Sequence, residues 1–200
     1  MKSYIILLAL AGIALSGCGK SSDSTGGAAG NASDGTTKGI IAYSTLTSNN
    51  PFFTVISNSL EAEARANGYD VITISGDEDV KKQSDQVQDF IVQKVSAIVL
   101  NPCDSKSIGP AIEAANKAGI PVFTCDIKCV APNAKVVSHI ATDNFQGGRL
   151  AGEAMIEALG EQGGEVLVLD KREVESCTLR VAGFKEVIAA HDANQTAGKI

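Results

Sequence analysis

The chain has 200 residues and a formal net charge of −6. Because the basic residues form no cluster, this charge argues against a nucleic acid as the partner. The length is enough for one domain or two small ones.

The first residues have the three-part layout of a secretory signal peptide. Lys2 gives a basic start, an apolar run extends from Tyr4 to Leu15, and small residues precede Cys18. The run is shorter than the ~20 residues that a bilayer-spanning helix needs. The ending "LSGC" resembles the bacterial lipobox, which implies that Cys18 is diacylated and becomes the mature N-terminus. We therefore expect residues 1–18 to be a lipoprotein signal peptide, with an ordinary signal peptide as the alternative.

Residues 19–38 are mostly Gly, Ser, Thr, Asp and Ala, with almost nothing to bury. Such a composition predicts a flexible tether. The sequence thus predicts an exported protein that is lipid-anchored to a bacterial membrane, on its periplasmic or cell-surface side.

From residue 39 onward, short apolar runs alternate with longer amphipathic segments. The expected strands are 39–45, 69–75, 95–102, 120–126, 134–143 and 164–170. The expected helices are 51–68, 80–94, 107–119, 144–160 and 176–191. In the second helix, Val80, Val87 and Ile91 are expected to form the apolar face. The segment "GGRLAG" at 147–152 indicates close helix packing.

This alternation predicts an α/β fold with a parallel, doubly wound sheet. Runs such as "AIVL" lack the polar alternation of a half-exposed strand, as expected when helices cover both faces.

In such a sheet a ligand binds beyond the carboxyl ends of the strands. The segments there, "STLTSNNPFF", "SGDED", "NPCDS" and "CDIKC", are rich in Asn, Asp and Ser. Amides donate and accept hydrogen bonds and carboxylates accept them, which suits a neutral, hydroxyl-covered ligand. Phe52 and Phe53 could pack in the core or lie against the C–H face of a sugar ring.

Three motifs, "NNPFF", "NPCDSKSIGPAIEAANKAGIPVFTCD" and "VVSHIATDNFQGGRLAG", resemble in order the ribose-type sugar-binding proteins of bacterial ABC transporters. These belong to the type 1 periplasmic binding protein family. The resemblance implies two α/β lobes that clamp a sugar between them. Residues 39–141 would form the N-terminal lobe and residues 142–200 the start of the C-terminal lobe. Family members are longer than this chain, so the second lobe is expected to be incomplete.

The resemblance also implies the site residues. Asn50 would hydrogen-bond the ligand, and Phe52 and Phe53 would line or stack on the sugar ring. Asn101 would face the cleft from the end of the third strand, and Asp126 would hold sugar hydroxyls.

Three departures from the family pattern add lower-ranked candidates. Ile127 and Thr178 stand where the family has arginines, whose forked donors neither residue replaces. The loop before the first helix is two residues longer than the pattern, so that Thr47 or Ser48 could reach the cleft, and this adds Ser48 as a candidate. These departures count against ribose itself as the ligand, in favour of another small sugar or polyol.

The resemblance implies capture of a sugar for an ABC permease and ATPase. A sugar or autoinducer receptor for chemotaxis or signalling is the open alternative. An enzyme on a flavodoxin-like fold is less favoured, because the chain has no Gly-x-Ser-x-Gly elbow and no strand followed by Gly-x-Gly-x-x-Gly. We expect no catalytic residue, metal or cofactor.

Four cysteines follow Cys18 in a chain expected to enter an oxidising compartment. Cys103 and Cys125 follow neighbouring strands, and Cys129 lies four residues further on. Strands in a sheet lie about 4.8 Å apart, close enough for a bridge. We therefore consider one disulfide among these three residues, with the pairing left open.

Overall fold

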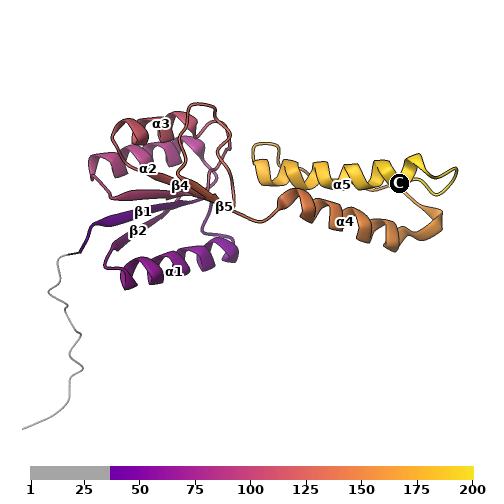
Figure 1. The fold of residues 1–200 in the computed structure, drawn as a ribbon, viewed down its shortest axis with the longest axis horizontal. Helices are drawn as coiled ribbons and strands as arrows, with labels where there is room; N and C mark the ends of the chain where they lie inside the picture. The colour runs from indigo at the N-terminus through magenta and orange to yellow at the C-terminus, as the bar shows by residue number, and fades with distance from the viewer. Residues whose placement is uncertain (1–36) are drawn as a thin grey trace, which may run out of the picture. The chain divides into compact units, whose positions relative to one another are not determined.

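A computed structural model describes residues 37–200 (Figure 1). The predicted signal peptide, its lipid-attachment residue Cys18 and nearly all of the predicted tether lie outside the described residues.

Five parallel strands form one sheet in the order β2-β1-β3-β4-β5. Their bounds are β1 Ile40–Thr45, β2 Asp70–Ser75, β3 Ala97–Leu100, β4 Val122–Cys125 and β5 Ser138–Ile140. Helices lie on both faces of this sheet, with α2 and α3 on one face and α1 on the other (Figure 1). The doubly wound α/β fold predicted from the sequence is therefore confirmed.

Three helices connect the strands. They are α1 Pro51–Ala66, α2 Val80–Val92 and α3 Gly109–Lys117. The main apolar core lies between the sheet and the α2–α3 layer, where Ala42, Ile98 and Val122 of the strands are fully buried. Ile112 of α3 is fully buried in the same core. This layer holds the strands in register and so fixes the positions of the loops at their carboxyl ends.

The apolar face predicted for α2 is confirmed, since Val87 is fully buried and Val80 and Ile91 are partly buried against the two core clusters. The buried residues of this helix also include Gln83, Gln86 and Phe90, which the apolar pattern did not single out. The two glutamines are buried because they bond to the ends of neighbouring strands, an arrangement that an apolar pattern does not reveal.

After the sheet, the chain forms α4 Asn144–Leu159, the short 3-10 helix η1 Gly160–Gln162 and α5 Glu175–Ala193. Helices α4 and α5 lie side by side (Figure 1). A Cβ atom built on Gly148 would lie 2.0 Å from the carbonyl oxygen of Arg180, and one on Gly183 would lie 2.1 Å from that of Phe145. The close helix packing predicted at residues 147–152 is therefore confirmed.

The strand predicted at residues 164–170 is not formed. The segment is apolar, but among residues 37–200 no strand pairs with it, and Leu167 and Leu169 are 85% and 87% exposed. An isolated extended segment has no ladder of hydrogen bonds, so its composition alone does not make it a strand.

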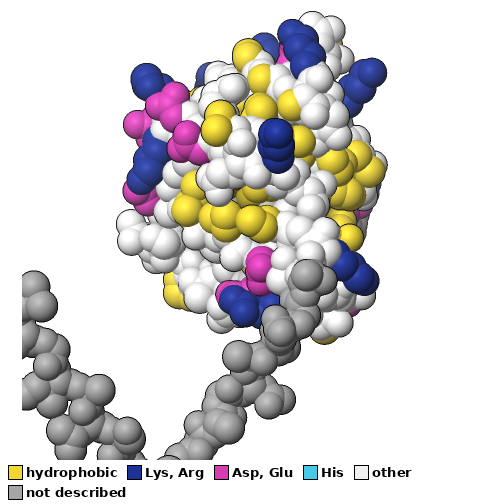
Figure 2. Space-filling model, turned by 90° about the vertical axis from the view of Figure 1, so that its left-hand side faces the viewer, with side chains coloured by type: hydrophobic (Ala, Val, Ile, Leu, Met, Phe, Trp, Pro, Cys, Tyr) yellow, Lys and Arg dark blue, Asp and Glu magenta, His cyan; other side chains and the backbone are white. Residues whose placement is uncertain are grey.

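The face of the sheet beside α1 is only partly covered. An apolar groove runs along it, and its lining includes Val55 of α1, Val99 of β3, Phe123 of β4 and Ile140 of β5. Hydrophobic side chains are exposed at the surface of the molecule (Figure 2). None of the helices between residues 37 and 200 combines the length and apolar character that crossing a membrane requires.

Candidate functional site

The loop after β1 ends at Asn50, which caps the N-terminus of α1. The side-chain oxygen of Asn50 accepts a hydrogen bond from the backbone N–H of Phe52 at 3.0 Å, and Pro51 is the first residue of α1. Asn caps and first-turn prolines both favour a helix N-terminus. Asn50 is exposed at the carboxyl end of the sheet, with its side-chain oxygen already used in the cap.

The two phenylalanines have different environments. Phe53 is 4% exposed and packs in a cluster with Leu46, Cys103 and Ile127, whereas Phe52 is 51% exposed. The two rings meet edge to face with centroids 5.3 Å apart. Phe53 is therefore a core residue that holds Phe52 in place, and Phe52 presents an open aromatic surface.

Asn101 lies beneath the strand ends and is fully buried. Its side-chain oxygen accepts a hydrogen bond from the hydroxyl of Tyr43, and its side-chain nitrogen donates to the carbonyl oxygen of Cys125. Burial raises the pKa of Tyr43 to about 12, so this hydroxyl keeps its proton at neutral pH. Asn101 thus joins the ends of three neighbouring strands.

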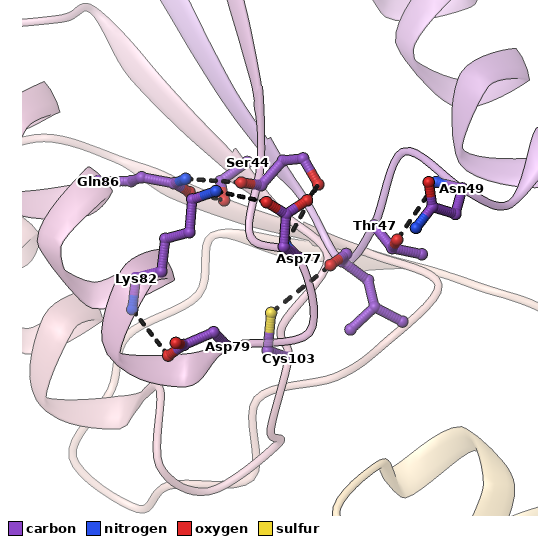
Figure 3. Close-up of polar contacts among 10 residues, drawn as sticks. Ser44, Thr47, Asn49, Asp77, Asp79, Lys82, Gln86 and Cys103 are labelled. Carbon is purple, nitrogen blue, oxygen red and sulfur yellow. Dashed lines mark hydrogen bonds and ion pairs between the residues drawn. The ribbon is translucent and has the colours of Figure 1, made fainter.

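Three further residues that the sequence did not single out, Ser44, Gln83 and Gln86, complete this polar network. Ser44 donates to the side-chain oxygen of Gln86 at 2.7 Å (Figure 3). Gln83 donates to the carbonyl oxygen of Asn101 at 3.0 Å and accepts from the backbone N–H of Cys103 at 2.8 Å. The sequence signal that could have indicated these glutamines is their spacing, three residues apart on α2 beside positions that are buried. Buried amides that are fully bonded rigidify the ends of the strands.

Asp126 directly follows β4 and has a left-handed backbone with φ of 61°. Its backbone N–H donates to the carbonyl oxygen of Ile140 at 2.8 Å, which fixes the turn. Burial raises the pKa of Asp126, and the charges of Arg180 and His139 oppose that rise. Among the hydrogen bonds recorded for residues 37–200, none ends on this carboxylate. It is thus a half-buried acceptor with capacity for a ligand donor.

His139 of β5 lies near this carboxylate. One ring nitrogen, Nδ1, is 2.8 Å from the hydroxyl of Thr124, and burial lowers the pKa of His139. A partly buried histidine held by a threonine suits a structural position beside the turn.

The lower-ranked candidates lie in three different places. Ile127 is 1% exposed and lies in the same buried cluster as Phe53, so its place among the ligand-binding candidates stays a prediction. An apolar side chain at this position fills the cluster at the strand ends. Thr178 lies near the start of α5, where its hydroxyl donates to the carbonyl oxygen of Glu175 at 2.9 Å. Ser48 is exposed and lines a small crevice rich in hydroxyl groups between α1 and β2.

The cysteines are all free thiols in the described part of the chain. The disulfide considered among Cys103, Cys125 and Cys129 is therefore not formed. Cys103 lies in the cluster at the strand ends, where its Sγ is 3.8 Å from the carbonyl oxygen of Leu46 (Figure 3). Cys129 packs instead in the main core. Although Cys103 and Cys125 follow neighbouring strands, their thiol groups form no bond to each other or to Cys129.

Asn50, Phe52 and Asp126 thus lie at the carboxyl end of the sheet and are at least partly accessible. The buried side chains at this end of the sheet are Phe53, Ile127 and Asn101. This combination offers an open aromatic surface and an ionisable acceptor. These groups can hold a small polar molecule, because a carboxylate accepts hydrogen bonds from its hydroxyl groups.

Comparison with known proteins identifies the family. The family model described as a periplasmic binding protein domain matches residues 41–199. The chain belongs to this family. Membership implies an extracytoplasmic location.

Two of the similar proteins are import binding proteins. The ribose import binding protein RbsB of Escherichia coli (strain K12) is 36% identical over 163 residues, which cover 81% of this chain and 54% of that protein. The D-apiose import binding protein of Paraburkholderia graminis is 36% identical over 149 residues, covering 74% and 47%. The chain therefore spans about half the length of these relatives.

A solved structure agrees with the fold. The solute-binding protein of an ABC transporter from Mycobacterium smegmatis, with bound glycerol, matches with a TM-score of 0.70 at 29% identity. The match covers 77% of this chain and 53% of that one.

Proposed function

We propose that this protein captures a sugar or a related polyhydroxyl compound outside the cytoplasm for an ABC importer. The observation that carries the proposal is Asp126, a half-buried carboxylate at the end of β4 whose pKa is raised by burial. A sugar hydroxyl donating to this oxygen would offset part of the cost of burying the charge. The import relatives favour transport over a sensory role.

The other predicted residues have distinct parts in this proposal. The exposed ring of Phe52 would lie against the C–H face of the sugar. Asn50 would contribute its side-chain N–H group, because its oxygen already caps α1. Asn101 and Phe53 would support the site rather than touch the ligand, since both are buried and engaged within the protein.

We also propose, from the sequence, that residues 1–18 are a lipoprotein signal peptide and that Cys18 carries a lipid anchor. A permease and an ATPase of the same transporter would be the protein partners. No catalytic step is part of the proposal.

The test is a thermal-shift screen of the full chain against D-ribose, D-apiose, glycerol and a set of pentoses, hexoses and polyols. At least one sugar should raise the melting temperature in a concentration-dependent way. The Asp126→Asn variant should lose most of that shift. Asp85→Asn is the matched control, because Asp85 is exposed on α2 and pairs with Lys81. No shift with any sugar, or equal shifts in both variants, would overturn the proposal.

A further inference from the structure

The segment at residues 165–169 has the burial pattern of a strand, although no described strand pairs with it. Glu165, Leu167 and Leu169 are exposed, whereas Val166 and Val168 between them are partly buried. The segment lines a cavity of about 300 Å³ together with residues of α4 and α5. Alternation with a period of two is typical of a strand that has one covered face. The even-numbered side chains therefore form the covered face, and the odd-numbered ones form the open face.

The backbone of the same segment has no partner within the described chain. Among the backbone hydrogen bonds recorded for residues 37–200, none involves residues 165–170. The N–H of Gly164, just before the segment, donates to the carbonyl oxygen of Lys199 at 3.0 Å. A row of unpaired N–H and C=O groups is a template on which another strand can add. The segment thus has the side-chain pattern and the unpaired backbone of a strand that lacks a neighbour.

The open face is complementary to itself when two copies pair in antiparallel directions. If Leu167 lies opposite Leu169 of a second copy, then Glu165 lies opposite Lys171 of that copy. The two-fold symmetry of such a pair makes each of these contacts occur twice. Residues directly opposite each other in an antiparallel pair have their side chains on the same face, close enough to interact. This register therefore pairs leucine with leucine and negative charge with positive charge.

Other arrangements of two copies match less well. A shift of two residues in one direction sets Glu165 opposite Leu169, and a shift in the other direction sets Leu167 opposite Lys171. Parallel pairing in register sets each charged residue opposite its own copy, and like charges directly opposite are destabilising. The order of residues on the open face thus favours antiparallel pairing in a single register.

Lys171 also has a partner within its own chain. Its Nζ lies 2.6 Å from Oε2 of Glu78, but the two side chains are 42% and 53% exposed. Exposed pairs of this kind contribute about 1 kcal/mol or less. Lys171 can therefore exchange Glu78 for Glu165 of a second copy at little cost.

We propose that residues 165–171 are a docking strand for a second copy of this chain, which pairs with it as a symmetric antiparallel dimer. Hydrogen bonds between the two segments would satisfy the backbone groups that are unpaired in one copy. Leu167 and Leu169, which are 85% and 87% exposed, would be covered by the same side chains of the second copy. The occupant is a second copy because the open face matches itself in both charge and apolar side chains. The dimer does not rest on the proposed function.

The test is sedimentation of the full chain in the analytical ultracentrifuge over a range of concentrations, with no sugar added. The parent should show an equilibrium between monomer and dimer. Leu167→Lys sets a lysine opposite Leu169 twice in each dimer and should weaken dimerisation by about 100-fold or more. The side chain is exposed, so circular dichroism should show an unchanged fold. Val92→Lys is the matched control, because Val92 is 79% exposed on α2, and it should leave dimerisation unchanged.

A charge exchange tests the register. Glu165→Lys and Lys171→Glu alone each set like charges opposite each other and should weaken the dimer by about tenfold. The double variant should return to within about twofold of the parent. Because the pair with Glu78 is lost in both variants of Lys171, this rescue reports only pairing between copies. A parent that stays monomeric, a dimer that survives Leu167→Lys, or a double variant no tighter than the single ones would overturn the proposal.

Discussion

At the scale of single residues, we expect Phe53 to contribute mainly to stability and the adjacent Phe52 mainly to sugar binding. Phe53→Ala should lower the free energy of unfolding by about 3 to 5 kcal/mol, because it empties a buried position. Phe52→Ala should change stability little, since half of the ring is exposed. It should instead weaken sugar binding by about 1.5 kcal/mol, or roughly tenfold. Urea unfolding and calorimetry measure the two effects, and a Phe52→Ala variant with parental affinity would contradict the assignment.

The raised pKa of Asp126 predicts how the free energy of unfolding changes with pH. Its pKa is raised in the folded state, so the folded protein binds more protons than the unfolded chain as pH falls toward that pKa. Stability should therefore rise as pH drops through the folded pKa, and the gain is complete below the unfolded value. In Asp126→Asn this part of the pH dependence should disappear. Asn also tolerates a left-handed backbone, which adds only a pH-independent gain.

The measurement is the free energy of unfolding of parent and variant between pH 7 and pH 4. The difference should favour the variant most at neutral pH and shrink toward acid. A constant difference across the range would show that the pKa of Asp126 is not raised in the folded state. The same variant should bind sugar about ten- to a hundredfold more weakly, since it loses a charged acceptor.

At the scale of elements, the glycines of α4 give a matched pair. A Cβ on Gly148 would collide with the backbone of Arg180 in α5, whereas one on Gly147 meets nothing within 4 Å. Gly148→Ala should force the helices apart and lower the melting temperature. Gly147→Ala should leave it unchanged or raise it slightly, because Ala favours helix by about 1 kcal/mol over Gly. The melting temperatures of the two variants are measured by circular dichroism, and equal changes in both would contradict the close packing of α4 and α5.

Most elements could be predicted because apolar periodicity and helix-stop glycines are local signals. The parallel direction of the strands followed from the rules of α/β folds, whereas their order comes from the structure. The strand predicted at residues 164–170 was wrong, because composition predicts extended backbone but not whether a neighbouring strand is present to pair with it.

The site could be predicted only in part, for a similar reason. The sequence located the strand ends and hence Phe52 and Asp126. It did not distinguish Phe53 from Phe52, or show that Ile127 is buried, because both facts depend on which side chains pack together. The role of Gln83 is equally non-local, since it bonds to a segment far away in the chain.

At the scale of the whole molecule, the groove beside α1 is an apolar surface formed by that helix and the strands of the sheet. Val55 is 64% exposed on α1 and lines this groove. Val55→Lys should reduce binding of the dye ANS while leaving stability nearly unchanged. Val92→Lys is the control, because Val92 is 79% exposed on α2 and does not line the groove. Equal dye binding by parent and Val55→Lys would show that the groove is not an accessible apolar surface.

The central claim is that a sugar binds at the carboxyl end of the sheet, with Asp126 as its acceptor. A crystal structure of the full chain with the sugar that gives the largest thermal shift tests it most directly. The account predicts a sugar hydroxyl within hydrogen-bond distance of the Asp126 carboxylate and the ring of Phe52 against a C–H face. A well-ordered sugar elsewhere, with Asp126 and Phe52 untouched, would contradict it.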